Sequence, residues 1–312
     1  MTVGVGVAAA AGAAGQRPQG GPGASAQVVA THRLEEGGTT LVVEIAAGSL
    51  DLGPDPIMSH VDKAAKAVTA YYGKFPIVGA RVLVVPVADD RGVLQGTTWG
   101  AVRGWPAFTR VRIGQHTTQA DLDDDWMMTH ELVHTAFPSM PDDQHWIEEG
   151  LSTYVEPVAR VQAGELKAAD IWRDMVRDMP KGEPRAGDEG IDHTHTWGRT
   201  YWGGALFCLM ADVAIRRETH NKKGLQDALR AIVGGGGTIN HDWDVTKALA
   251  LGDDATGTHV LMKLYAEWKD KPVNADLAKL WEDLGIKAAN GGVEFVDSAR
   301  DAAIRKAITA AR

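Results

Sequence analysis

The sequence predicts an α+β protein in which a β-rich half precedes a mainly α-helical half. Two observations support this order. Short runs of β-branched and other apolar residues, typical of strands, occur mainly before residue 114. After residue 120, apolar residues recur at the three- and four-residue spacing of helices. The expected parts are therefore a β-rich subdomain over residues 26–120 and a helical subdomain over residues 121–312.

The strands of the first half follow from these apolar runs. They are expected over residues 27–30, 40–45 and 81–87, with one or two bent edge strands within 96–113. One helix interrupts them. Residues 57–72 place apolar side chains at helical spacing, and Gly73 suits the end of that helix.

The second half is expected to consist mostly of helices. Four aspartates between residues 121 and 125 favour the positive end of its first helix, which Pro138 should terminate. A second helix is expected over residues 146–161, where Pro157 should kink it or end it early. Further helices are expected over residues 168–179, 201–218, 224–232, 258–268, 277–284 and 298–311, with a short strand at 293–296.

Composition excludes several function classes. The net charge is −9 and no run of basic residues occurs, so neither nucleic acid nor an anionic membrane is expected as a partner. The single cysteine, Cys208, excludes an internal disulfide and a cluster of thiolate metal ligands. No stretch is long and apolar enough to predict a membrane span.

The first 25 residues are expected to be a disordered leader or the remnant of an export signal. They consist mostly of Gly, Ala, Pro and Gln without a period. Residues 3–14 resemble the region before a signal cleavage site, but no Lys or Arg precedes them. The sequence therefore leaves open whether the protein is exported (periplasmic or secreted) or cytoplasmic.

The stretch that carries chemistry is His-Glu-x-x-His, at residues 130–134, on an expected helix. Imidazoles four residues apart lie on one helical face, so His130 and His134 can bind one Zn²⁺. Glu131, beside the first histidine, can act as general base toward the water at such an ion. A catalytic zinc also needs a third protein ligand and an open position. The sequence therefore predicts one catalytic zinc ion and a further ligand elsewhere.

The segment after this helix resembles the third-ligand helix of the gluzincin metallopeptidases. Trp146, Glu149, Gly150, Tyr154 and Glu156 match the pattern of the alanyl and glycyl aminopeptidase branches. The resemblance implies a thermolysin-like catalytic domain with the zinc site between its β-rich and helical subdomains. It also implies that Glu149 is the third zinc ligand.

Glu148 is the competing choice for this ligand, and helix geometry separates the two glutamates. Glu149 and Glu156 are seven residues apart, or about two turns, so they share a face. Glu156 can then serve as the carboxylate that orients a zinc-bound imidazole. The residue seven beyond Glu148 is Val155, which cannot do this. Glu149 is therefore the expected ligand.

Residues 201–205 are similar to the Tyr-x-x-Gly-Ala helix start of the same aminopeptidase branches. In those enzymes the tyrosine hydroxyl donates to the oxyanion of the tetrahedral intermediate, so the resemblance implies this role for Tyr201. A structural tyrosine at the start of a buried helix is the alternative. His195 is an alternative oxyanion donor, because an imidazolium can do the same work.

Substrates in this clan pair with a strand edge just before the zinc helix. Residues 99–105 match that edge, which makes Gly100, Ala101 and Arg103 the candidate substrate-binding residues. Aminopeptidases with a Gly-Ala-Met-Glu-Asn strand hold the free amino group of the substrate with its glutamate. Here Val102 and Arg103 follow Gly100 and Ala101. This departure argues against the usual aminopeptidase anchor.

Together these residues predict a zinc metallopeptidase acting on a peptide or protein substrate. Two alternatives remain at this point. One is a zinc hydrolase of a non-peptide acyl substrate, since the metal chemistry does not depend on the acyl group. The other is a binding module on a peptidase scaffold without catalysis. Its sign would be a missing ligand or base, and neither is missing.

Overall fold

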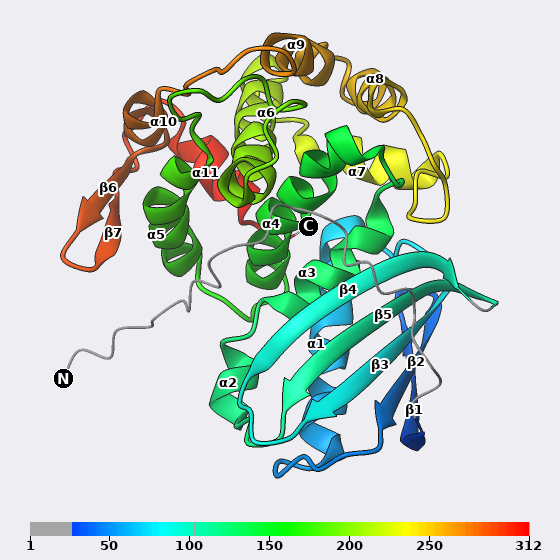
Figure 1. Ribbon diagram of the computed structural model, residues 1–312. Coiled ribbons are helices and arrows are strands. Elements are labelled where there is room, and N and C mark those ends of the chain that lie inside the picture. The colour runs from blue at the N-terminus through cyan, green and yellow to red at the C-terminus, as the bar shows by residue number, and fades with distance from the viewer. Residues whose placement is uncertain (1–26, 103, 312) are drawn as a thin grey trace.

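The computed structural model describes residues 27–102 and 104–311 of the chain. A twisted sheet forms one end of the molecule, and most of the helices gather at the other (Figure 1). The leader expected over residues 1–25 and the candidate substrate residue Arg103 lie outside the described residues.

The sheet has five strands in the order β1-β2-β3-β5-β4. Their bounds are β1 Val28–Glu36, β2 Thr39–Ala46, β3 Gly79–Val87, β4 Val93–Val102 and β5 Trp105–Gly114. The two central pairings, β2 with β3 and β3 with β5, are parallel, whereas β1–β2 and β4–β5 are antiparallel. The region expected to give one or two edge strands is a hairpin, of which only β4 lies at the edge. Strand β5 is paired on both sides.

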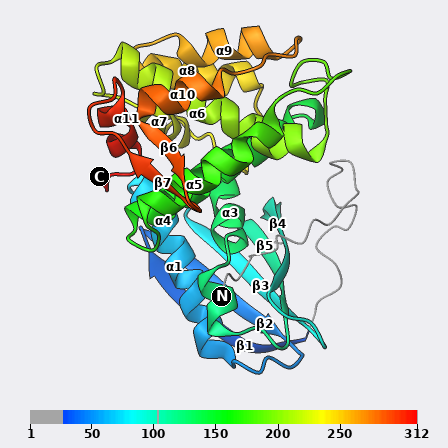
Figure 2. The ribbon, with the colours of Figure 1, turned by 90° about the vertical axis from the view of Figure 1, so that its left-hand side faces the viewer.

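Helix α1 (Pro54–Tyr72) connects β2 to β3 and packs along the sheet (Figure 2). Its fully buried residues Ile57, Val61 and Val68 follow the spacing that predicted the helix. Gly73 ends it in the left-handed conformation, with φ of 79°. This expectation from the sequence is confirmed.

The single helix expected after residue 121 is two helices, α2 (Gln119–Asp123) and α3 (Met127–Val133). The chain breaks because it contains two successive caps. Thr118 and Asp121 form a capping box for α2. The Asp125 carboxylate then accepts the backbone N–H groups of Met127 and Met128, each at 3.0 Å, and begins α3.

Helix α4 (His145–Gln162) runs through Pro157, so the expectation that this proline ends the helix early is wrong. A proline in a helix interior costs one backbone hydrogen bond and a steric clash. Most of α4 is buried, and it packs against α1, α3 and α6. This tertiary packing offsets the local cost.

Smaller helices complete the second half of the chain. They are α5 Ala168–Asp178, α6 Gly204–Glu218, α7 Leu225–Gly234, α8 Val245–Thr256, α9 Val260–Trp268, α10 Leu277–Leu284 and α11 Ala302–Ile308. A hairpin of β6 (Ile286–Ala289) and β7 (Gly292–Phe295) lies between the last two. Helix α8 and strand β6 were not expected from the sequence.

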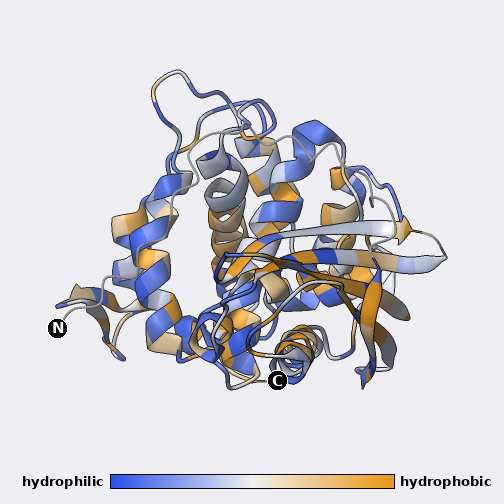
Figure 3. Cartoon of the chain, turned by 60° about the horizontal axis from the view of Figure 1, so that its bottom comes forward, coloured by the Kyte–Doolittle hydropathy of each residue, from blue (hydrophilic) through white to orange (hydrophobic). Residues whose placement is uncertain are grey.

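Along the helices and strands, apolar residues alternate with polar ones (Figure 3). None of the described helices is long and apolar enough to cross a bilayer.

Candidate active site

Helix α3, the 3₁₀ turn η1 (His134–Ala136) that directly follows it, and helix α4 bring the three expected zinc ligands together. His130 and His134 lie one turn apart, with ring centroids 4.9 Å from each other. Glu149 reaches them from the start of α4. Its Oε2 lies 3.1 Å from Nε2 of His130 and 3.6 Å from Nε2 of His134. One donor atom from each of these residues lies within 4.8 Å of the others.

This donor set fits a catalytic zinc ion. Tetrahedral zinc with bonds of about 2.0–2.1 Å holds its ligand atoms roughly 3.3 Å apart, close to the separations found here. Two imidazoles and one carboxylate fill three positions and leave the fourth open. Burial acts to raise the pKa of Glu149, but His134, His130 and His145 outweigh it and hold that pKa well below its usual range. Glu149 is therefore an ionised carboxylate suited to binding a cation.

The expected general base, Glu131, lies between α3 and the edge strand β4. Burial raises the pKa of its carboxyl group. The Thr98 hydroxyl donates to Oε2 of Glu131 at 2.8 Å, and it also lies 3.0 Å from the hydroxyl of Thr109 on β5. A Cβ at Gly96 would overlap the Glu131 side chain, so only glycine leaves it room. Sequence reasoning missed both β4 residues.

The structure brings Gly96 and Thr98, rather than Gly100 and Ala101, against the general base. Gly100 packs on the backbone carbonyl of Ile239, and the Ala101 N–H donates to Oδ1 of Asn240 at 2.8 Å. The resemblance to the substrate-binding strand of the aminopeptidases rested on the residue pair Gly100 and Ala101. The pairing of β4 with β5 sets which residues face α3, and the sequence does not show that register.

Tyr201 lies over the ligand His130, with ring centroids 6.1 Å apart and planes 18° from parallel. Burial, reinforced by the charges of Glu149 and Glu131, raises the pKa of its hydroxyl. The group therefore keeps its proton at neutral pH and can donate it in a hydrogen bond. His195, the alternative donor, is exposed on the loop before Tyr201. Among the described residues no hydrogen bond or ion pair joins it to the three ligands.

Two glycines explain how Tyr201 reaches the ligands. Gly150 directly follows Glu149 on α4, and Gly204 begins α6 immediately after the π-helical turn Gly198–Gly203 (η4). A Cβ at Gly150 would overlap the backbone of Gly204, and one at Gly204 would overlap that of Trp146. The two helices therefore touch at their backbones, which carries the turn with Tyr201 over the start of α4.

Two further residues of α4 contact the candidate ligands, and the sequence analysis missed both. His145 lies 3.0 Å from Oε2 of Glu148 and 3.1 Å from Oε1 of Glu149. Burial opposes protonation of His145, but these two carboxylates raise its pKa to about 10. The Ser152 hydroxyl lies 3.3 Å from Nδ1 of His134. The sequence indicates these contacts only through helical spacing, because His145 precedes Glu149 by four residues and Ser152 follows it by three.

Glu156 was expected to orient a ligand imidazole, and that contact is not formed. Its carboxylate accepts a hydrogen bond from Arg160 at 2.9 Å, one turn further along α4. Nδ1 of His130 is buried without a hydrogen-bond partner in the described structure. Burial raises the pKa of Glu156 to about 7, against the opposing effect of Arg160. An arginine one turn away competes successfully for this carboxylate.

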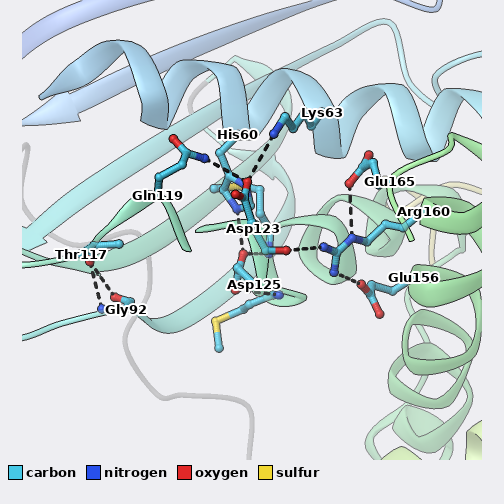
Figure 4. A network of polar contacts seen from close by, with 12 residues as sticks. His60, Lys63, Gly92, Thr117, Gln119, Asp123, Asp125, Glu156, Arg160 and Glu165 are labelled. Atoms are coloured by element: carbon cyan, nitrogen blue, oxygen red, sulfur yellow. Dashed lines mark hydrogen bonds and ion pairs between the residues drawn. The ribbon is translucent and has the colours of Figure 1, made fainter. Parts of the chain in front are cut away.

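Arg160 belongs to a buried polar network beside the site (Figure 4). It donates to the backbone carbonyl of Asp123 at 3.0 Å and pairs with Glu165. His60 on α1 lies 2.8 Å from the Asp125 carboxylate that caps α3. The network thus ties α1 and α4 to the start of α3, the helix that carries His130 and leads directly into His134.

Solved structures with a similar fold include an aminopeptidase N family protein and M1 zinc metallopeptidases. An aminopeptidase N family protein from Idiomarina loihiensis is 14% identical, with a TM-score of 0.62 over 82% of this chain and 49% of its own. A two-domain M1 zinc metallopeptidase mutant bound to L-arginine is 15% identical, with a TM-score of 0.52 and coverage of 80% and 53%. An M1 mutant from Deinococcus radiodurans bound to a Tyr-Ser-Ala substrate is 15% identical, with a TM-score of 0.50 and coverage of 80% and 52%.

This chain shares the fold of the M1 zinc metallopeptidases. It spans about half the length of each of these structures. No protein-family model matches the sequence, and no curated protein is significantly similar to it. The M1 fold agrees with the resemblance that the sequence motifs indicated, and that part of the interpretation is confirmed.

Proposed function

We propose that this protein is a zinc-dependent peptidase of the gluzincin type. The observation that carries the proposal is the convergence of three donor atoms within 4.8 Å from His130, His134 and Glu149. A buried carboxylate and a protonated tyrosine lie beside them, at Glu131 and Tyr201. The fold supports the same function, because the structures that share it are metallopeptidases.

In this proposal Glu131 moves the proton. A zinc ion held by the three ligands supplies Lewis acidity toward the peptide carbonyl and lowers the pKa of water. Glu131 accepts the proton of the attacking water and returns it to the leaving amine. Burial raises the pKa of this carboxyl group, which favours its acceptance of a proton from water.

Tyr201 supplies the second stabilising group. Negative charge develops on the former carbonyl oxygen as water adds, and a preorganised hydroxyl donor lowers the energy of that state. The ring of Tyr201 is fixed between His130 and Trp197, at 6.1 Å and 5.8 Å between centroids. Its hydroxyl is thus held in place before substrate arrives.

The edge of β4 is the proposed substrate-binding strand. Among the described residues β4 pairs with another strand on one side only, so an extended peptide could pair along its other side. The sequence of β4, Val-Leu-Gln-Gly-Thr-Thr-Trp-Gly-Ala-Val, carries no carboxylate to hold a free amino group. We therefore propose peptide-bond hydrolysis without an amino-terminal anchor on this strand.

The variant Glu131→Gln tests the proposal. It should retain zinc, because Glu131 is not a ligand, and should lose peptide hydrolysis by about a hundredfold or more. The measurement is a mass-spectrometric cleavage profile on a peptide library, with parallel ester and amide panels and elemental analysis of zinc. Unimpaired cleavage by the variant would contradict the general-base role. Cleavage of esters or small amides alone would replace the peptidase with a different zinc hydrolase.

A further inference from the structure

Two exposed tryptophans flank the candidate zinc site. The chain has ten tryptophans, all within the described residues. Only Trp126 and Trp197 are largely exposed, with 48% and 53% of their surface accessible. Large aromatic side chains are usually well buried, so exposed rings at one place indicate a binding surface.

Both rings lie against the catalytic groups. The Trp126 ring lies edge-on to His130, with centroids 5.2 Å apart and planes at 89°. The Trp197 ring stacks on Tyr201, with centroids 5.8 Å apart and planes at 26°. His130 and Tyr201 in turn face each other. The four rings therefore form a continuous row, with an exposed tryptophan at each end and the proposed zinc ligand and oxyanion donor between.

The charges around Trp197 favour a neutral ligand. The ammonium group of Lys181 lies 6.0 Å from the centroid of the Trp197 ring and 5.5 Å from that of Trp202. Asp178 holds it there through an ion pair of 2.8 Å. A tryptophan face attracts one cation well, and a second cation on the same ring would be repelled by the first. The exposed part of the ring is thus suited to an apolar group.

We propose that Trp126 and Trp197 are specificity-determining residues that bind the apolar side chains next to the scissile bond. The substrate class is then peptides with a large neutral side chain, aromatic or aliphatic, beside the cleaved bond. This inference rests on the proposed peptidase function. The side chains next to a carbonyl held at the zinc position would lie near the two exposed indoles, because one indole contacts His130 and the other contacts Tyr201.

The test compares cleavage by the zinc-loaded full chain and by Trp126→Ala and Trp197→Ala. Phe295→Ala is the matched control, since Phe295 is an exposed aromatic residue, 39% accessible, on β7. Peptide pairs that differ only in a residue beside the cleaved bond, with Phe in one and Ser or Lys in the other, separate a loss of side-chain preference from a general loss of activity. Each tryptophan variant should lower kcat/KM about tenfold more for the Phe peptide than for the Ser peptide. The control should change neither.

A second measurement does not depend on turnover. In the Glu131→Gln background, a Phe-containing peptide should bind more weakly to the Trp126→Ala and Trp197→Ala variants, while their zinc content stays constant. An equal loss for all peptides would show that the indoles only support the catalytic rings and would overturn the inference. Preference of the unmodified protein for basic or small side chains would overturn it too. A protein that cleaves no peptide at all would instead contradict the proposed function.

Discussion

The Thr98 hydroxyl fixes the position of the Glu131 carboxylate. It donates to Oε2 of Glu131 at 2.8 Å and lies 2.9 Å from the backbone carbonyl of the same residue. Thr109 lies 3.0 Å behind it and can donate to the Thr98 oxygen, which leaves the Thr98 proton for Glu131. In the proposed mechanism Thr98 is therefore a positioning residue that acts through Glu131.

The variant Thr98→Val should lower kcat by about ten- to a hundredfold with little change in KM. Misplacing a base by a fraction of an ångström affects the chemical step more than substrate binding. Thr98→Ser should restore most of the activity, because it keeps the hydroxyl. Thr97→Val is the control, since the Thr97 hydroxyl donates to the backbone carbonyl of Gly96. An equal loss in both valine variants would assign the effect to the strand as a whole.

At the level of elements, α1, α3 and α4 meet through buried charged groups rather than through apolar contacts alone. Asp125 both caps α3 and accepts from His60 on α1. Arg160 on α4 joins Glu156 to the backbone at Asp123, where α2 ends. Because unpaired buried charges are costly, each of these groups fixes the position of its partner helix.

The variant Glu156→Gln should alter the pH dependence of stability. The pKa of Glu156 is raised from its ordinary value of 4.5 to about 7, mainly by burial. Between these pH values the folded chain binds a proton that the unfolded chain has lost. This group therefore stabilises the fold most at low pH, and its contribution falls as pH rises through about 7, by up to about 3 kcal/mol.

The free energy of unfolding, measured by urea denaturation from pH 4.5 to pH 8, checks this. The difference between Glu156→Gln and the unmodified protein should shift in favour of the variant as pH rises. Glu294→Gln, at an exposed carboxylate of β7, should give a flat difference. A flat difference for Glu156→Gln would show that Glu156 is ionised throughout the range and paired with Arg160.

The sequence predicted elements better than the contacts between them. Periodicity located α1, α4 and most later helices, because each buries one face. It did not reveal the break between α2 and α3, where Asp125 acts as a cap, or the passage of α4 through Pro157. Helical spacing selected Glu149 but misassigned the partner of Glu156. Arg160, four residues further along the same helix, binds this carboxylate instead, and the sequence shows both candidate partners without showing which of them it pairs with.

At the scale of the whole molecule, the site lies where the edge of the sheet meets the helices. Strand β4 supplies Thr98 and Gly96 from one side, and α3, η1, α4 and the η4 turn supply the candidate ligands and Tyr201 from the other. The candidate ligands and Tyr201 span about 70 positions of the sequence, from His130 to Tyr201. They meet because α4 contacts both α3 and α6. The sequence located the candidate substrate strand but not which of its residues face α3, because its register is a property of the assembled sheet.

Zinc content in two matched variants tests the central claim most directly. Glu149→Gln removes the proposed ligand, and Glu148→Gln makes the same change one residue earlier. Elemental analysis of zinc after gel filtration should find about one ion per chain in the unmodified protein and in Glu148→Gln, and little or none in Glu149→Gln. Full zinc content in Glu149→Gln, or its loss in Glu148→Gln alone, would contradict the proposed metal site.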